Sequence, residues 1–156
     1  MILIPDMQKI LIQSLIAHTH AADLQGRECD VLTLNSEQRR WVRGLLVTAS
    51  GREVALSLPT GTVLQPEQIL WVEDSWYLQV KAAPEPVLRI APSDGRHAVR
   101  IAFEVGNRHF PLAMDGETLL VPDDPAMVQL LDRLGVVWQR TSAVFQPVGQ
   151  AHRHEH

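Results

Sequence analysis

Short runs that alternate apolar and polar residues fill the first half of the chain and predict β-strands. Alternation with a period of two lets one face of a strand pack on a core while the other meets solvent. Turn-forming residues such as Gly51 and Gly61 separate the runs. We expect strands over residues 30–35, 41–48, 53–58, 68–72 and 76–82, and one more buried strand or helix within residues 1–20. The pattern predicts a β-rich domain over residues 1–83.

Two prolines, Pro84 and Pro86, mark a change in this pattern. Proline lacks a backbone donor and disfavours helix for the residue before it, so we place a domain junction here. Beyond the junction, apolar residues recur at helical spacing in two places. We expect strands over residues 86–90, 110–114, 118–121 and 136–144, and helices over residues 93–105 and 125–134.

The first predicted helix carries its own start and stop signals. Ser93 or Asp94 can cap its beginning, and Gly106 can end it in a left-handed turn. The whole order of elements, strand, helix, strand, strand, helix, strand, is the βαββαβ order of the ferredoxin-like fold. The sequence therefore predicts an α+β protein: a β-rich N-terminal domain, a ferredoxin-like C-terminal domain over residues 84–149, and a tail over residues 150–156.

The composition is typical of a folded protein with its own core. The chain has 156 residues, of which 46% are hydrophobic, and a formal net charge of −4. Basic residues are scattered apart from Arg39, Arg40 and Arg43, so we expect no nucleic-acid partner. The apolar N-terminal run is interrupted by Gln13 and Ser14 and falls short of the roughly 20 residues that span a bilayer. We therefore expect no membrane partner.

The single cysteine, Cys29, cannot form an internal disulfide, which indicates a reducing compartment. We expect the protein to be cytoplasmic. The sequence contains no serine nucleophile elbow, no glycine-rich phosphate loop and no HExxH pair of a zinc hydrolase, so we expect that it is not an enzyme. Two kinds of function remain open: a metal carrier that uses its histidines, and a protein-interaction adaptor that uses the β-rich domain.

Three histidines alternate in the C-terminal tail, at His152, His154 and His156. In an extended segment this spacing puts all three imidazoles on one side, where they can hold nickel, copper or zinc. A solvated chain end without a role, or an appended tag, accounts for the same residues. Because ordering a chain end costs entropy, we expect the tail to bind metal only weakly unless a fixed ligand helps.

His109 is the candidate for that fixed ligand. It follows the predicted helix end and precedes Pro111 by two residues, so the direction of its backbone is constrained. One imidazole makes no metal site, but two copies would meet if the chain formed a two-fold homodimer with this segment near the axis. The alternative is an ordinary surface histidine with a hydrogen-bond partner.

Three segments resemble the urease accessory nickel chaperones of the UreE family in order and spacing: GREVALSLPTGTVL, KAAPEPVL and GNRHFP. The resemblance runs from about residue 30 to residue 147. It implies a homodimer formed through the ferredoxin-like domain, and nickel as cargo, for which zinc or copper can compete. It further implies delivery to the urease apoprotein complex together with an accessory GTPase. By this resemblance His109 binds nickel across the dimer interface, and His152, His154 and His156 add ligands.

The sequence departs from the family pattern before the second helix. Some members carry further metal-binding histidines there, whereas this chain has Asp123 and Asp124. We expect no auxiliary metal site at this point, because these aspartates are placed to cap the helix. The remaining residues that we considered and expect to have no metal-binding role are His18, His20, His97 and Cys29.

Overall fold

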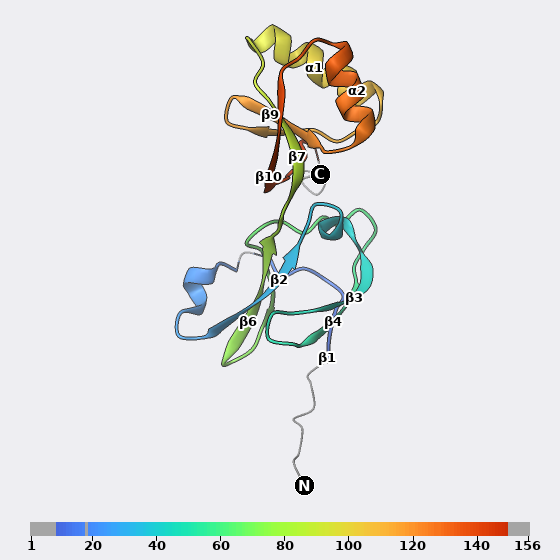
Figure 1. Cartoon of the computed structure of the whole chain (residues 1–156). Coiled ribbons are helices and arrows are strands. Elements are labelled where there is room, and N and C mark those ends of the chain that lie inside the picture. The colour runs from blue at the N-terminus through green and yellow to red at the C-terminus, as the bar shows by residue number, and fades with distance from the viewer. Residues whose placement is uncertain (1–8, 18, 150–156) are drawn as a thin grey trace. The chain divides into compact units, whose positions relative to one another are not determined.

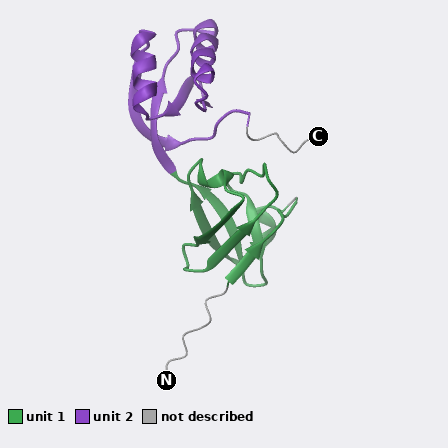
Figure 2. Cartoon of the chain, turned by 90° about the vertical axis from the view of Figure 1, so that its right-hand side faces the viewer, with its two compact units in different colours: residues 1–83 green, residues 84–156 purple. Residues whose placement is uncertain are grey.

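The structure, a computed structural model, describes residues 9–17 and 19–149 (Figure 1). The chain divides into two compact units, Met1–Ala83 and Pro84–His156 (Figure 2). Each unit buries its own cluster of apolar side chains. Each therefore has the core that a separate folding domain requires.

Two three-stranded sheets form the first unit, with strand orders β1-β4-β3 and β2-β6-β5. The strands are β1 (Lys9–Ile12), β2 (Glu28–Leu34), β3 (Arg43–Val47), β4 (Glu53–Ser57), β5 (Ile69–Val72) and β6 (Trp76–Ala82). In each sheet one pair is parallel and the other is antiparallel. Alternate residues from both sheets, among them Ile10, Leu32, Val54 and Leu78, share one buried cluster. This arrangement confirms the β-rich N-terminal architecture that the alternating pattern predicts.

The strand predicted over residues 41–48 is two residues shorter at its start than expected. A 3-10 turn, Gln38–Arg40, precedes it and has Trp41 as its C-cap. Asn35 and Gln38 hold this turn, because the side-chain oxygen of each accepts a hydrogen bond from the backbone N–H of the other at 2.9 Å. These two hydrogen bonds thus end β2 at Leu34 and shift the start of β3 to Arg43.

Within the described part of the apolar N-terminal segment, Lys9–Ile12 form a strand and no helix is present. β1 pairs in parallel with β4, and its alternate residues Ile10 and Ile12 enter the core. A 3-10 turn, Ala21–Leu24, follows before β2 begins. The pairing with β4 explains why this segment is a strand, because it buries one face of β1 and leaves Leu11 on the outer face of the sheet.

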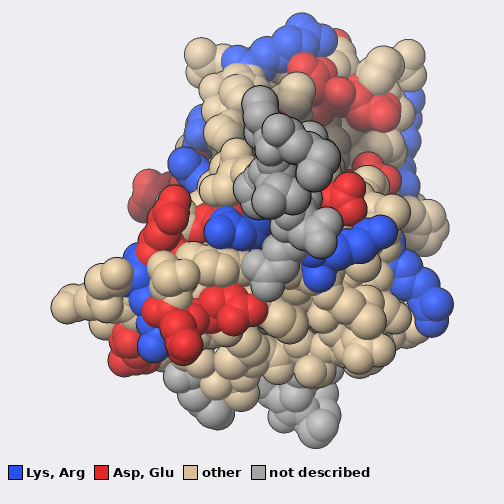
Figure 3. Space-filling model, turned by 90° about the horizontal axis from the view of Figure 1, so that it is seen from below, with Lys and Arg blue, Asp and Glu red and all other residues tan. Residues whose placement is uncertain are grey.

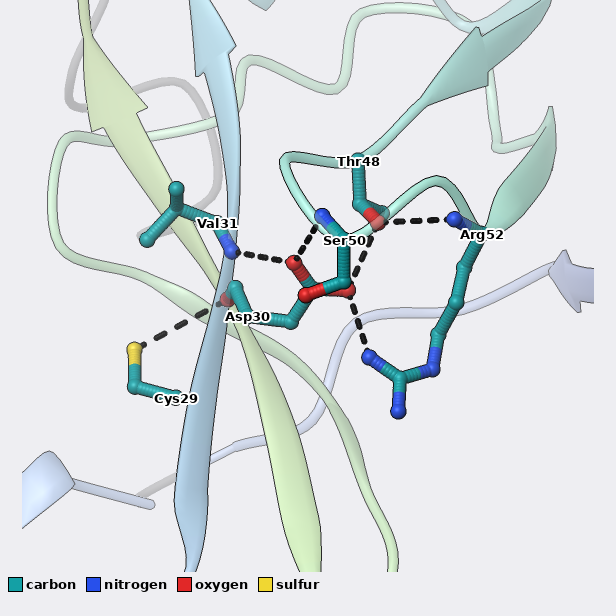
Figure 4. A network of polar contacts seen from close by, with 6 residues as sticks. All are labelled: Cys29, Asp30, Val31, Thr48, Ser50 and Arg52. Carbon is teal, nitrogen blue, oxygen red and sulfur yellow. Dashed lines mark hydrogen bonds and ion pairs between the residues drawn. The ribbon is translucent and has the colours of Figure 1, made fainter.

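A buried carboxylate, Asp30 on β2, ties this strand to the turn between β3 and β4 (Figure 4). It accepts hydrogen bonds from the backbone N–H groups of Val31 and Ser50, each at 3.0 Å. The hydroxyl of Thr48 donates to it at 2.6 Å, and the guanidinium of Arg52 at 2.8 Å. Burial alone raises the pKa of Asp30, but the hydrogen bonds from Thr48, Arg52 and Ser50 outweigh burial and hold that pKa below 3.8.

The second unit has the ferredoxin-like fold. Its elements are β7 (Pro84–Ile90), α1 (Gly95–Asn107), β8 (Ala113–Asp115), β9 (Thr118–Pro122), α2 (Pro125–Arg133) and β10 (Trp138–Val144). The strands lie in the order β10-β7-β9-β8, and every neighbouring pair is antiparallel. The predicted βαββαβ fold is therefore confirmed. Among the described residues, no helix is long and apolar enough to cross a membrane.

Both helices cover one face of this sheet (Figure 1). Leu88 and Ile90 of β7 belong to the same buried cluster as Ile101 of α1 and Leu130 of α2. A smaller cluster joins Val87 with residues of β8, β9 and the segment after β10. Because α1 is anchored along its inner side, the residues that follow it leave the helix from a fixed position.

Candidate metal centre

His109 lies two residues beyond the end of α1, at a place that the helix determines. Asp94 caps the start of α1, where its carboxylate accepts a hydrogen bond from the backbone N–H of His97 at 2.8 Å. At the other end Arg108 is the C-cap, and His109 has a positive φ of 62°. His109 thus occupies the position after the C-cap in the left-handed conformation, where glycine is the usual residue.

Two backbone hydrogen bonds close the turn at His109. The N–H of His109 donates to the carbonyl of Gly106 at 2.9 Å, and the N–H of Phe110 donates to the carbonyl of Val105 at 3.4 Å. This pair of bonds is the Schellman motif. Phe110 packs against the core cluster that contains Val105, which is the apolar contact typical of the motif. The fold therefore holds the backbone on both sides of His109.

The predicted helix end is wrong by two residues. Gly106, which we expected to be left-handed, lies inside α1, and the strand predicted over residues 110–114 begins only at Ala113. The apolar contact of Phe110 with the helix explains the shift, because it places the reversal at the residue before Phe110. A left-handed residue other than glycine costs on the order of 1 kcal/mol, although histidine tolerates this region better than most. The chain thus keeps a strained residue where glycine would be relaxed.

The imidazole of His109 is exposed and, among the described residues, takes part in no hydrogen bond or ion pair. Its ring nitrogens are therefore open to a partner outside this part of the chain. Within residues 9–17 and 19–149, no three His, Cys, Asp or Glu side chains are grouped so that they could hold a metal ion. The structure accordingly brings no two further ligands of these types to His109 from the described segments. His152, His154 and His156 lie outside the described residues.

The two aspartates before α2 have structural partners. Asp124 is the N-cap, and its carboxylate accepts a hydrogen bond from the backbone N–H of Ala126 at 2.8 Å. Asp123 forms an ion pair with Arg140 at 3.2 Å. The expected helix cap is confirmed for Asp124, whereas Asp123 does not cap the helix and pairs with Arg140 instead.

The other candidate ligands are separated from His109 in the chain and lie in other surroundings. His97 accepts a hydrogen bond at Nδ1 from the backbone N–H of Ser93 at 3.0 Å, within the first turn of α1. His20 precedes the first 3-10 turn in the other unit, and His18 lies outside the described residues. Cys29 is exposed, and its thiol lies 3.5 Å from the side-chain oxygen of Gln79.

The three clustered arginines of the first unit, Arg39, Arg40 and Arg43, differ in their exposure to solvent. Arg39 is buried and donates a hydrogen bond to the carbonyl of Leu34 at 3.0 Å, so it is part of the fold. Arg40 and Arg43 remain exposed. On the face of the molecule shown in Figure 3, basic and acidic side chains are intermixed. That face therefore offers no continuous basic surface of the kind that follows a phosphate backbone.

Two family models match the chain, one after the other. The N-terminal domain of the UreE urease accessory protein matches residues 12–83, and the C-terminal domain of the same protein matches residues 85–156. Together they cover both structural units. A protein built from these two domains is an accessory protein and not an enzyme.

Individual relatives agree with the models over most of the chain. The urease accessory protein UreE of Paraburkholderia xenovorans (strain LB400) is 37% identical over 150 residues, which cover 93% of this chain and 67% of that protein. The protein of the same name from Synechococcus sp. (strain JA-3-3Ab) is 40% identical over 121 residues, which cover 78% of this chain and 81% of that protein. The chain belongs to the UreE family of urease accessory proteins.

Proposed function

We propose that this chain binds nickel through His109 and delivers it to the urease apoprotein complex during assembly of the enzyme. One observation carries the metal-binding part: an exposed imidazole without a partner among the described residues, on a backbone held in a strained conformation. Strain of this kind is concentrated at functional sites, because selection otherwise replaces the residue with glycine. Membership of a family of urease accessory proteins supports nickel as the cargo.

We further propose that the site forms between two copies of the chain. A single imidazole binds a divalent metal weakly, and the described residues do not complete a set of three ligands around His109, so further ligands have to come from elsewhere. Val99 and Phe103 lie on one outer stripe of α1, because they are four residues apart, and they are 70% and 63% exposed. Phe103 lies about 6 Å along the helix axis before the end of α1. A two-fold contact through this stripe would bring the two His109 side chains toward each other.

His152, His154 and His156 add ligands to this pair in the proposal. Imidazole also binds zinc and copper, so either metal can compete with nickel for the same site. Protons and metal compete for the same lone pair of the imidazole, so we expect acid to weaken binding. Delivery takes place in the cytoplasm, together with an accessory GTPase.

The outer face of the β1-β4-β3 sheet is the proposed docking surface for the recipient. Leu11 and Leu45 lie directly opposite Ala55 from either side, so the three residues form one row across the sheet. Leu11 is 52% exposed, Leu45 is 70% exposed, and neighbouring Val47 is 65% exposed. Exposed apolar side chains that adjoin one another on a sheet face are typical of protein contact surfaces.

Calorimetric titration of the metal-free full chain with nickel tests the metal site. We expect one tight site per two chains, and weaker sites that disappear when residues 150–156 are removed. His109→Asn should abolish the tight site and leave the fold intact, because asparagine also adopts the left-handed conformation. His20→Gln, an exposed histidine of the other unit, is the matched control and should bind nickel like the wild type.

The solution mass of the chain, measured with and without nickel, tests the two-chain arrangement. Phe103→Asp should shift the mass toward one chain and should weaken the tight site. If the tight site survived His109→Asn but disappeared when residues 150–156 were removed, the tail and not His109 would supply its main ligands.

The row of exposed apolar residues also favours a second candidate, an adaptor whose histidines have no role. Leu45→Asp separates the two candidates, because it changes the proposed docking surface and leaves His109 untouched. In a metal carrier, this variant should lose binding to the urease apoprotein and keep the nickel titration of the wild type. An adaptor would lose the same binding, but its wild type would show no tight nickel site.

A further inference from the structure

A hollow of about 210 Å³ lies between the start of α1 and the end of α2. Its lining consists of His97, Arg100, Ile101, Arg133, Leu134 and Val136. We propose that this hollow binds a small organic carboxylate, one carboxylate group attached to a short aliphatic chain. The proposal goes beyond nickel delivery and does not depend on it, since none of the lining residues belongs to the proposed metal site.

The rim of the hollow supplies positive charge that the described part of the chain does not neutralise. Arg100 and Arg133 are both exposed, and neither guanidinium forms an ion pair or a hydrogen bond with another described residue. A guanidinium presents parallel N–H donors that match the two oxygens of a carboxylate. Two such groups on one hollow therefore favour an anion with at least two oxygens.

His97 adds a third donor to the same rim. The backbone N–H of Ser93 donates to its Nδ1 at 3.0 Å, so the neutral ring carries its proton on Nε2. The other ring nitrogen is thus a donor in both the neutral and the charged form. His97 also lies in the first turn of α1, where the positive end of the helix dipole favours a bound anion.

Two acidic residues close to the hollow in sequence are engaged elsewhere, and Glu104, four residues after Arg100, forms no ion pair with it. Asp94 caps α1 through the backbone N–H of His97, and Asp132 accepts a hydrogen bond from the indole nitrogen of Trp138 at 2.9 Å. At the end of α2, the backbone N–H groups of Gly135 and Val136 donate to carbonyls of the last helical turn at 3.1 and 3.0 Å. These carbonyls are therefore satisfied within the helix end.

The floor of the hollow is apolar and decides the kind of anion. Ile101 is 1% exposed, Val136 is 7% exposed, and Leu134 is half-buried. Inorganic phosphate would leave this floor uncovered and would use only the rim. The volume has room for roughly seven water-sized groups. A carboxylate with about four aliphatic carbons fills it, with the charge at the rim and the carbons on the floor.

Amide chemical shifts of the isotope-labelled, metal-free full chain, followed during titration, test the proposal. Three probes are used: isovalerate, N-acetyl-leucine as a mimic of a peptide carboxyl end, and inorganic phosphate. We expect isovalerate or N-acetyl-leucine to shift the amides of His97, Arg100 and Arg133, with phosphate binding at least about tenfold more weakly. Tighter binding of N-acetyl-leucine would identify a chain end as the source, and tighter binding of isovalerate would identify a free acid.

Charge-removing variants complete the test. Arg100→Gln and Arg133→Gln should each weaken binding about tenfold, because each removes one bidentate partner. Arg96→Gln is the matched control, since Arg96 lies in α1 one turn before Arg100 and does not line the hollow; it should change binding less than twofold. Equal binding of phosphate, or equal loss in all three variants, would overturn the proposal. Because no metal is present, either result would leave the nickel proposal unaffected.

Discussion

Asp30 in the β-rich unit and His109 in the ferredoxin-like unit are polar residues with opposite surroundings. Asp30 is buried, and its carboxylate accepts four hydrogen bonds, among them one from Thr48 and one from Arg52 (Figure 4). His109 is exposed, has a positive φ, and its ring has no hydrogen-bond partner among the described residues. The fold supplies all the partners of the Asp30 carboxylate, whereas it holds the backbone of His109 and gives its ring no partner among the described residues.

This difference distinguishes a polar group that the fold requires from one for which we propose a metal ligand role. A buried charge is tolerated only when its hydrogen bonds are complete, so replacing it should cost folding free energy. A strained, exposed residue contributes nothing to the fold that glycine could not supply, which agrees with the ligand role that we propose for the side chain of His109. Substitutions at the two sites should therefore have effects of opposite kind.

The largest loss of stability is expected for Asp30→Asn. It removes the charge that Arg52 and Thr48 stabilise, which should lower the free energy of unfolding by about 3 kcal/mol. Urea denaturation at pH 7 measures this change. Asp74→Asn, at an exposed turn position between β5 and β6, is the control and should change the free energy by less than about 0.5 kcal/mol. Equal effects of the two substitutions would contradict a structural role for the network.

A smaller loss is expected for Phe110→Ala, which removes the apolar contact of the turn at His109. Phe110 is half-buried, so the cost should be about 2 kcal/mol, below that of a fully buried phenylalanine. Nickel affinity should fall as well, because the backbone of His109 loses its support. Phe103→Ala on the exposed stripe should leave the stability of a single chain nearly unchanged and weaken self-association instead. The two variants are compared by denaturation and by solution mass.

The smallest effect is the pH dependence that Asp30 confers. Its pKa in the folded chain lies below the ordinary value of 3.8, so the folded state favours the charged form. The resulting stability is present above pH 3.8 and is lost as the pH falls through the folded pKa. The difference in unfolding free energy between the wild type and Asp30→Asn should therefore shrink at pH 3 relative to pH 7. A constant difference over this range would show that ionisation of Asp30 contributes nothing.

Local patterns predicted most of the elements, because alternation and caps act over a few residues. The strand predicted over residues 76–82 coincides with β6, and Asp94 caps α1 as its position indicates. The parallel pairing of β1 with β4 was not predictable, because about 40 residues separate the two strands and no turn connects them directly. Alternation identifies which face of a strand is buried, but it contains no information on the neighbouring strand.

At the candidate site, too, local sequence patterns could not predict what contacts between distant residues determine. His109 could be singled out from its neighbours, but its left-handed backbone could not, because Gly106 carries the stronger local signal. The contact of Phe110 with the core places the left-handed residue at His109 instead of Gly106. The hollow beside Arg100 and Arg133 was also not predictable, since it exists only where the start of α1 meets the end of α2.

His109→Gly tests the central claim most directly, through nickel titration and urea denaturation of the same preparation. Glycine relaxes the left-handed position, so the free energy of unfolding should rise by about 1 kcal/mol. The same substitution removes the imidazole, so the tight nickel site should be lost, with affinity falling at least about a hundredfold. A variant that is less stable than the wild type, or that keeps the tight nickel site, would contradict the account.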